Sequence, residues 1–404
     1  MENYKGIHYL KNKLNLKRGR VMLRYQYYEM KHLARDFGIS TPPDLSRWMG
    51  VLGWCGKAVD TLADRLNFRE FDNDVFDMNT IFNMNNRDIL IDSAILGALV
   101  TACDFIYITQ DEDGYPLMRT IDGAHATGII DPTTNLLKEG YAVLERDDQD
   151  QPVTEAYFMA GQTLIYERGK LTKIAKTPAP YPLLVPVINR PDAKRPFGHS
   201  RISRACMSLV DSAVRTAKRS EIAAEFYSYP QKYILGMSED AEQMDKWRAS
   251  MSAMLRIDKD EDGDHPVVGQ FQQQTMGPHM EQLRMFAGLF AGETGLTMDD
   301  MGFPTDNPSS AEAIKASHET LRLAARKAQR DIGTALVNAG YLAACVRDGL
   351  PYLRRQVYNT IPKWEPIFEP DMSTLSTIGD GVIKINQAVP GYVDSDKIRD
   401  LTGV

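Results

Sequence analysis

The sequence has few cysteines and lacks the common motifs of catalysis, cofactor binding and metal binding. Its 404 residues include four cysteines, far apart and without C-x-x-C or Cys/His ligand spacing. This pattern predicts reduced structural thiols rather than a disulfide framework or a zinc site. No G-x-x-x-x-G-K-[ST], G-x-S-x-G, H-E-x-x-H or Rossmann glycine pattern occurs. We therefore expect no cofactor, no bound metal and no catalytic residues.

Long apolar runs and an excess of basic residues are also missing. The most apolar run, residues 89–108, is interrupted by Asp92 and Asp104, and no apolar segment follows the first methionine. We expect neither a membrane span nor a signal peptide. The formal net charge of −7 argues against a broad basic surface that wraps nucleic acid, but it permits a channel in which DNA slides without being gripped.

The longest patterned stretch, from Gly277 to Gly349, predicts a helix, an irregular loop and a second, very long helix. Apolar residues recur in the first helix at three- and four-residue steps, and the loop is rich in Gly, Pro, Asp and Asn. Ser309 and Glu312 have capping-box spacing, and no proline follows until Pro351. A helix of about 35 to 40 residues would span roughly 55 to 60 Å. That length favours packing against further copies of the chain.

Two glycines interrupt the first of these helices. Gly288 and Gly292 each cost the helix about 1 kcal/mol relative to alanine. They indicate either close approach of identical helices around a ring, or an early end or kink in the helix.

The N-terminal part predicts an α+β domain. A helix with basic and tyrosine positions, its basic face solvated, ends before Pro42, the next helix is capped by Asp44 or Ser46, and another begins near residue 87. After Cys103 short β-type runs alternate with turns, which favours antiparallel hairpins packed on the helices. The runs cover residues 105–108, 117–121, 141–144, 156–159, 163–166 and 183–188. The proline in the last run suits an edge strand.

The middle of the chain predicts two long helices that carry a small module. A basic, proline-rich boundary at 190–198 precedes a helix to about residue 226, and its basic flank is either solvated or faces phosphates or a neighbour's acids. Residues 227–276 form a compact α/β insert. Its acidic turn begins like an EF-hand at Asp258, but the closing twelfth position is Gly269, which offers no side-chain ligand.

Several motifs in order resemble the portal proteins of tailed bacteriophages, the connectors at the vertex of the head. The similarity covers nearly the full length of the chain. The motifs are Val59-Asp60, Leu184–Ile188, Phe197–Ile202, Tyr229–Leu235 and the loop from Glu293 to Ile314.

The resemblance implies an α+β, mainly α fold with named parts. Residues 1–195 would be the wing, 196–226 the first stem helix, 227–276 the clip and 277–294 the second stem helix. Residues 295–310 would be the tunnel loop, 311–349 the crossing helix of the wing and 350–404 a short crown.

The resemblance also implies functional residues. The tunnel loop would present Thr297, Met298, Asp299, Asp300, Met301 and Phe303 to a DNA channel. The stem would contribute Arg215, Lys218, Arg219, Glu281, Arg284, Gly288 and Gly292. The clip would dock partners through Trp247, Asp258, Asp260, Glu261 and Asp262.

A portal would form a ring of about twelve copies in the virion, made in the bacterial cytoplasm and placed at one capsid vertex. Its partners would be terminase large subunit, a head-completion or adaptor protein, scaffolding and major capsid protein, and double-stranded DNA passing through the channel. It would package and eject DNA without an ATPase of its own. The alternatives are a cytoplasmic helical scaffold protein and an enzyme whose site is assembled only in space.

Overall fold

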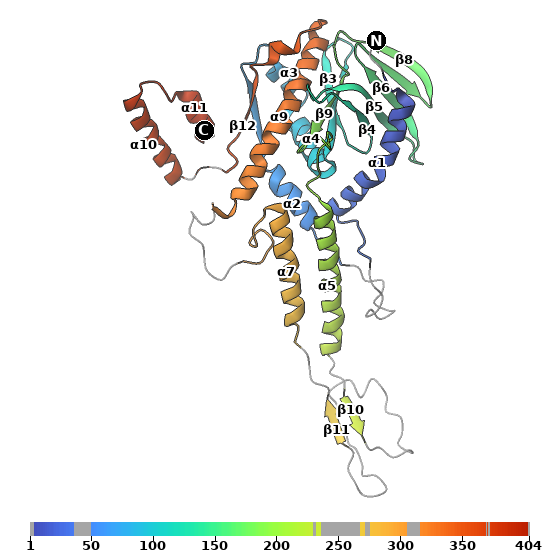
Figure 1. Cartoon of the computed structure of the whole chain (residues 1–404), viewed down its shortest axis with the longest axis vertical. Coiled ribbons are helices and arrows are strands. Elements are labelled where there is room, and N and C mark those ends of the chain that lie inside the picture. The colour runs from blue at the N-terminus through green and yellow to red at the C-terminus, as the bar shows by residue number, and fades with distance from the viewer. Residues whose placement is uncertain are drawn as a thin grey trace.

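The computed structural model describes residues 4–35, 50–228, 232–235, 267–270, 275–304, 316–368, 370 and 372–402. A head of packed helices and sheets stands on a stalk of two long helices, with a two-stranded ribbon at the far end of the stalk (Figure 1). The predicted α+β, mainly helical fold is confirmed.

Four helices form the N-terminal part of the head. They are α1 (Ile7–Tyr28), α2 (Trp54–Ala63), α3 (Met78–Met84) and α4 (Arg87–Thr101). The predicted helix near residue 87 and the helical spacing through Cys55, Val59 and Leu62 are confirmed, because the apolar faces of α2 and α4 are buried in the main core. Helix α2 begins at Trp54, and the predicted caps Asp44 and Ser46 lie outside the described residues. The short helix α3 was not predicted. Asp74 holds its start by accepting hydrogen bonds from the backbone of Met78 and Asn79, both at 2.8 Å.

Helix α1 lies on a sheet through its basic residues as well as its apolar ones. Lys13 Nζ donates to the carbonyl of Gly128 at 2.6 Å, and Lys17 Nζ donates to that of Ala126 at 2.9 Å. Burial lowers the pKa of Lys17 to about 8. The prediction of a solvated basic face is therefore wrong for these lysines, whose long stems reach across the interface to strand carbonyls.

A carboxylate from the sheet completes the start of α1. Glu139, almost fully buried, accepts hydrogen bonds from the backbone N–H groups of Lys5 and Gly6 at 2.8 and 3.1 Å and from the Tyr157 hydroxyl at 2.7 Å. A negative charge at this end of a helix also interacts favourably with the helix dipole. The N-terminal helix is thereby joined to a strand more than a hundred residues away.

Besides a two-stranded ribbon, the described part of the head contains two larger antiparallel sheets rather than the single sheet predicted. A three-stranded sheet has the order β3-β2-β9, and a five-stranded sheet has the order β4-β5-β6-β7-β8. The strands are β2 (Cys103–Gln110), β3 (Pro116–Ile121), β4 (Ala126–Ile130), β5 (Leu137–Arg146), β6 (Pro152–Met159), β7 (Gln162–Glu167), β8 (Lys170–Lys176) and β9 (Leu184–Ile188). Strand β9 carries Pro186 and is an edge strand, as predicted.

The long helix α9 (Glu319–Asp348) contacts all three strands of the smaller sheet. It ends as predicted, with Gly349 in the left-handed conformation at φ 68°. It is shorter than predicted, because His318 is a turn and the 30-residue helix begins at the next residue. The proposed capping box of Ser309 and Glu312 lies outside the described residues.

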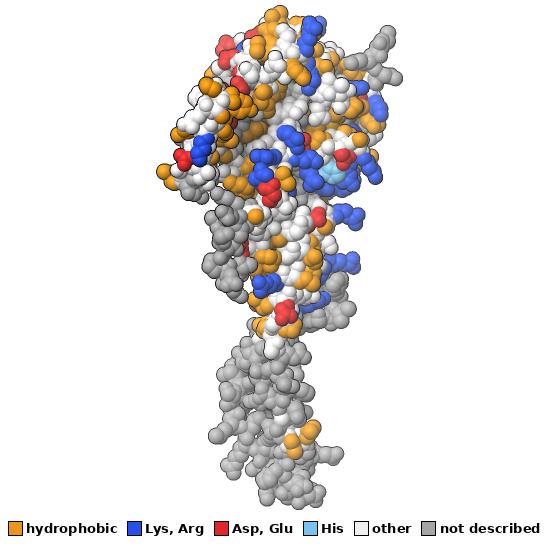
Figure 2. All heavy atoms as spheres, turned by 60° about the vertical axis from the view of Figure 1, so that its left-hand side comes forward, with side chains coloured by type: hydrophobic (Ala, Val, Ile, Leu, Met, Phe, Trp, Pro, Cys, Tyr) orange, Lys and Arg blue, Asp and Glu red, His pale blue; other side chains and the backbone are white. Residues whose placement is uncertain are grey.

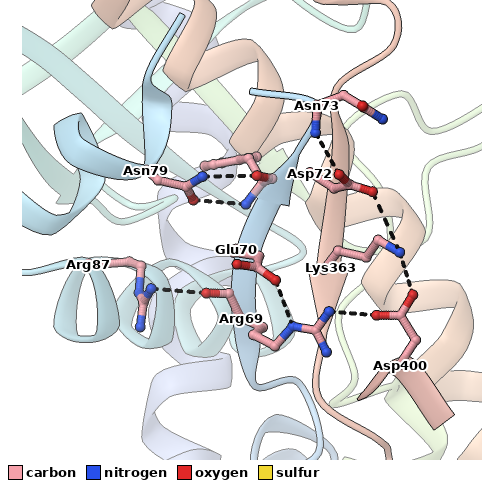
Figure 3. A network of polar contacts seen from close by, with 9 residues as sticks. Arg69, Glu70, Asp72, Asn73, Asn79, Arg87, Lys363 and Asp400 are labelled. Atoms are coloured by element: carbon pink, nitrogen blue, oxygen red, sulfur yellow. Dashed lines mark hydrogen bonds and ion pairs between the residues drawn. The ribbon is translucent and has the colours of Figure 1, made fainter. Parts of the chain in front are cut away.

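A two-stranded ribbon joins distant parts of the chain. Strand β1 (Phe68–Asp72) pairs antiparallel with β12 (Ile361–Trp364), which follows the short 3-10 helix η2 (Arg354–Val357). The final helices are α10 (Met372–Ala388) and α11 (Ser395–Thr402), and the predicted helix near Ser395 is confirmed. Figure 3 shows how α11 is fastened: Asp400 accepts from Arg69 of β1 at 2.5 Å and from Lys363 of β12.

Candidate interaction surface on the helical stalk

The stalk consists of α5 (Arg204–Ser228) and α7 (Gly277–Thr294), which pack side by side over much of their length (Figure 1). Cys206, Val210 and Ala213 of α5 are buried, as are Ala287 and Phe290 of α7. Polar contacts add to this packing at separate heights. Thr216 Oγ1 donates to Gln282 Oε1 at 3.0 Å, and Ser203 Oγ donates to Glu293 Oε1 at 2.8 Å.

The far ends of the two stalk helices lead into a ribbon. Strand β10 (Lys232–Leu235) pairs antiparallel with β11 (Val267–Gln270). This confirms the prediction that the ends of the two helices come together around an inserted module. The clip residues Trp247, Asp258, Asp260, Glu261 and Asp262 lie outside the described residues, and so does the acidic turn.

The top of the stalk is fixed to the head by the segment Phe197–Ile202. Gly198 has φ +73°, and a side chain there would meet the carbonyl oxygen of Asn189 at 2.2 Å. Arg201 then reaches across the junction, where Nε donates to Ala58 O at 3.2 Å and Nη2 donates to the carbonyl of Thr294. A cation at that carbonyl neutralises the partial negative charge at the end of α7.

The outer face of α7 is apolar and exposed. Met285 and Leu289 are 51% and 54% exposed, and Met280 lies further along the helix with a similar exposure. Glu281 and Arg284 are exposed as well, which fits their prediction as stem surface residues. Figure 2 shows hydrophobic side chains along the stalk and Lys and Arg side chains projecting at one edge. Such a face on a water-exposed helix is typical of an interface.

The two stem glycines do not serve packing within the chain. Helix α7 continues through Gly288 and Gly292 to Thr294, so the alternative of an early helix end is wrong. A Cβ at Gly288 would meet Met298 Sδ at an ordinary 3.6 Å, and a Cβ at Gly292 would meet no atom of the described residues within 4 Å. At Gly292, no described residue covers this side of the helix.

The basic stem residues on α5 are less exposed than their pattern indicates. Lys218 is only 9% exposed. Arg215 is half-buried and donates to Ser212 Oγ at 3.0 Å, and Arg219 is half-buried too. Lys218 is therefore a correction to the predicted channel surface, since a side chain buried against its own chain offers little charge to a ligand.

The loop after α7 is folded back onto the core. Asp300 accepts hydrogen bonds from both the backbone N–H and the hydroxyl of Thr297 at 2.9 Å, which closes a tight turn. Met301 is 8% exposed and belongs to the main core, against which Met298 and Phe303 also pack. The prediction that Met301 faces a channel is therefore wrong for this conformation. Of the six predicted loop residues, Asp299 is the most exposed.

The sequence matches the family model described as "Phage portal protein, SPP1 Gp6-like" over residues 7–374. This match covers almost the whole chain. The chain belongs to this phage portal protein family. The resemblance found in the sequence motifs is therefore confirmed, and so is the prediction of a structural virion protein rather than an enzyme.

Two curated relatives are similar to this portal-family chain. The portal proteins of Mycobacterium phage L5 and Mycobacterium phage D29 are each 24% identical to it over 315 residues, covering 73% of this chain and 65% of each relative. The chain thus spans about two thirds of the length of the curated relatives that it matches.

Among solved structures, two are similar at a TM-score of 0.48 and 14% identity, covering 93% of this chain and 97% of each matched chain. They are the neck of a native gene transfer agent particle, with C12 symmetry, and the neck of an empty particle, with C6 symmetry.

Other kinds of site find no support in the described part of the portal-family chain. Among those residues, no group of three His, Cys, Asp or Glu side chains could hold a metal ion, and no helix is long and apolar enough to cross a membrane. The four cysteines are all free and buried, and burial raises the pKa of Cys345 to about 11. A thiol of this kind is unreactive at neutral pH.

Sequence reasoning missed one surface of the portal-family chain altogether. A groove of about 950 Å³ lies beside α9, and its opposite wall comes from η2 and β12. The residues of the opposite wall follow α9 in the chain, at 354–364, and no local pattern in the sequence indicates that they meet it. Strand β12 contacts α9 directly and also pairs with β1.

Proposed function

We propose that this chain is the subunit of a portal ring of about twelve copies at one vertex of a phage capsid. Double-stranded DNA would pass through the centre of the ring during packaging and ejection. Family membership supports this function. Within the structure, the exposed apolar face of α7 is the observation that carries the ring, because a single chain leaves Met285 and Leu289 in water.

The geometry fits a ring better than a two-fold dimer. In a closed ring each copy uses two different surfaces, so one contact can repeat around an axis. The stalk offers two such surfaces, an apolar outer face on α7 and a polar, basic flank on α5. Neighbouring stalks side by side would cover the α7 face and enclose a channel.

The stalk ribbon and the residues between its strands would form the clip, which docks the terminase large subunit during packaging and a head-completion or adaptor protein afterwards. Scaffolding and major capsid protein would meet the head, as the wing. Helix α9 would be the crossing helix, and α10 and α11 would form a short crown. The protein would be made in the bacterial cytoplasm and would end in the virion.

The loop at 295–304 is the part of the tunnel that a translocating duplex would pass. Its exposed carboxylate at Asp299 would limit binding of phosphates, so that DNA slides instead of adhering. Thr297 and Asp300 would shape the turn, and Met301 would fasten it to the core.

Native mass spectrometry of the purified chain tests the ring. Twelve copies of 45.5 kDa should give a species of about 546 kDa. Negative-stain images of the same sample should show a closed ring with a central hole. A chain that stays monomeric or dimeric at high concentration, with or without its scaffolding protein, would contradict the proposal.

The channel is tested with Asp299→Lys, using Asp299→Asn as the control that removes the carboxylate without adding a cation. Both variants should form rings, because Asp299 lies outside the core of the loop. Heads assembled with the Lys variant should protect less DNA from nuclease than heads with the Asn variant. Equal amounts of protected DNA in wild type and both variants would argue against a channel role for this loop.

A further inference from the structure

The groove beside α9 is basic and apolar at once. Its lining includes Arg326 and Arg330 of α9 and Arg354 and Arg355 of η2, and no Asp or Glu is found among the described residues that line it. Its floor and rim are apolar, formed by Gly333, Pro362 and Trp364 with Leu323, Tyr358 and Ile361 around them.

These arginines are not neutralised by acids within the groove. Arg354 donates to two neutral acceptors, Asn338 Oδ1 and Thr134 O, both at 3.3 Å. The carboxylate of Glu319, on the same helix, is engaged by Arg322 at 2.5 Å. The side chains that line the groove thus include four arginines and no carboxylate, while Glu319 and Asp331, outside the lining, interact electrostatically with Arg326 and Arg330.

The rim of the groove exposes large apolar groups to water. Tyr358 is 86% exposed, and Leu323 and Ile361 are each at least half exposed. A phosphate backbone would satisfy the arginines but would leave these side chains uncovered. The occupant that fits both features is a protein surface that is acidic and apolar.

The same chain carries such a surface where α3 meets α4. This acidic corner consists of Asp64, Met84, Asp88, Ile89 and Asp92. Ile89 is 74% exposed and Met84 nearly as much. Partial burial and the nearby charges of Asp88 and Asp64 raise the pKa of Asp92. Arg87 forms an ion pair with Asp88 at 2.9 Å. The carboxylates of the corner, those of Asp64, Asp88 and Asp92, therefore outnumber this one paired arginine.

We propose that the basic groove of one copy binds the acidic corner of a second copy. The two surfaces have opposite charges and both expose apolar groups, so joining them would cover these groups and relieve the repulsion within each surface. The two surfaces are different, so the contact can repeat from copy to copy around a ring. This inference rests on the proposed portal ring and names a contact that holds its heads together.

Charge reversal tests the contact in the full-length chain. Arg326→Glu, Arg330→Glu and Arg355→Glu together make the groove acidic, because Arg354 is then the one arginine left among its lining residues, and Asp88→Arg with Asp92→Arg makes the corner basic. Either variant alone should reduce the fraction of closed rings in native mass spectrometry by roughly tenfold or more, because like charges then face each other. The control Lys170→Glu with Lys173→Glu and Lys327→Glu makes the same charge change as the groove variant outside the groove and should assemble as wild type does.

Mixing the two variants gives the decisive outcome. In an equimolar mixture every contact between unlike copies pairs opposite charges, so rings of alternating copies should return. A chain that carries all five reversals should also assemble. Thermal unfolding of each variant alone shows whether it is folded, and a folded variant that assembles only in the mixture can be explained by the contact and not by misfolding.

Crosslinking provides a second measurement that does not depend on charge. Ile89→Cys with Ile361→Cys places one thiol in the acidic corner and one in the groove, while the four natural cysteines are buried. Oxidation should give a ladder of covalent oligomers that reducing agent removes. Ile89→Cys with Ile174→Cys, in which the second thiol lies on the exposed strand β8, should give no ladder.

The outcomes separate this inference from the proposed function. Wild-type rings together with normal assembly of both reversed variants would overturn the groove contact and leave the portal ring intact. A monomeric wild type would contradict both proposals. Wild-type rings that are lost in each variant and restored in the mixture would establish both.

Discussion

The head and the stalk use helical glycines in opposite ways. In α9, a Cβ at Gly340 would meet Met78 Sδ at 2.6 Å, and a Cβ at Gly333 would meet Pro362 Cγ at 2.7 Å. In α7, Gly292 meets no described atom within 4 Å. Each glycine costs its helix about 1 kcal/mol relative to alanine. The head offsets this cost by close packing within one chain, whereas no described residue packs closely against Gly292 in the stalk.

The largest expected effect is at the closed site in the head. Gly340→Leu inserts a side chain where α3 already touches α9, and overpacking of this kind costs roughly 1–3 kcal/mol of unfolding free energy. Denaturant unfolding should show a lower midpoint than wild type. An unchanged midpoint would mean that α3 moves aside freely, and the head would then be less closed than the contact distances indicate.

The matching substitution in the stalk should raise the free energy of unfolding instead of lowering it. Gly292→Ala should raise the stability of the unassembled chain by about 1 kcal/mol, because it improves the helix without creating a clash. The same change should weaken ring formation, because a methyl group occupies the side of α7 that the neighbour approaches. The measurements are denaturant unfolding at low concentration and the ring fraction at high concentration. Improved stability with unchanged assembly would remove the argument for close contact at this glycine.

The buried Lys17 in the head should make the free energy of unfolding depend on pH. Burial lowers the pKa of Lys17 from its ordinary 10.5 to about 8, so the unfolded chain binds more protons than the folded chain between these values. Burying the charged Lys17 lowers the free energy of unfolding, and this penalty is fully present below pH 8. The penalty decreases as the pH rises from about 8 to 10.5, so the free energy of unfolding increases over that range. Lys17→Met should exceed wild type in stability most clearly below pH 8, with an advantage that shrinks above it. A pH-independent difference between the two unfolding free energies would contradict this account.

The smallest effect concerns the C-terminal helices. Asp400→Asn weakens the ion pairs that fasten α11 to β1 and β12, and partly exposed pairs contribute about 0.2–1 kcal/mol. The global unfolding midpoint should hardly change. Hydrogen exchange in α11 should accelerate while exchange in α9 stays as in wild type. Equal acceleration in both helices would show that the stability of the head depends on the ion pairs of Asp400.

Much of the helical architecture was predictable because each helix carries its own signal. Helix α7 was predicted with its observed ends, and the left-handed Gly349 marked the end of α9. The β-type runs after Cys103 were also recognised. Strand β8 was missed because it is mostly exposed and alternates lysines with apolar residues. Strands β1 and β12 were missed because each is short and is defined by a partner almost three hundred residues away.

The candidate sites were less predictable, because burial depends on tertiary contacts. Met301 and Lys218 both stand in polar sequence surroundings, yet both are buried against their own chain. The basic groove needs walls from two separate segments, and the acidic corner needs α2, α3 and α4 to meet. No local pattern contains that information. Glu281 and Arg284 are exposed on a regular helix, and their place in a channel stays a prediction.

The pairing of β1 with β12 sets a condition on synthesis. Thr360 Oγ1 donates to Asn73 O across 287 residues, and the ribbon beside it cannot form until both strands have left the ribosome. The head therefore remains incomplete while most of the chain is being translated. A nascent or prematurely terminated chain lacks β12 and with it one wall of the groove. Incomplete translation products would therefore lack the groove contact proposed above, and they would be excluded from a growing ring.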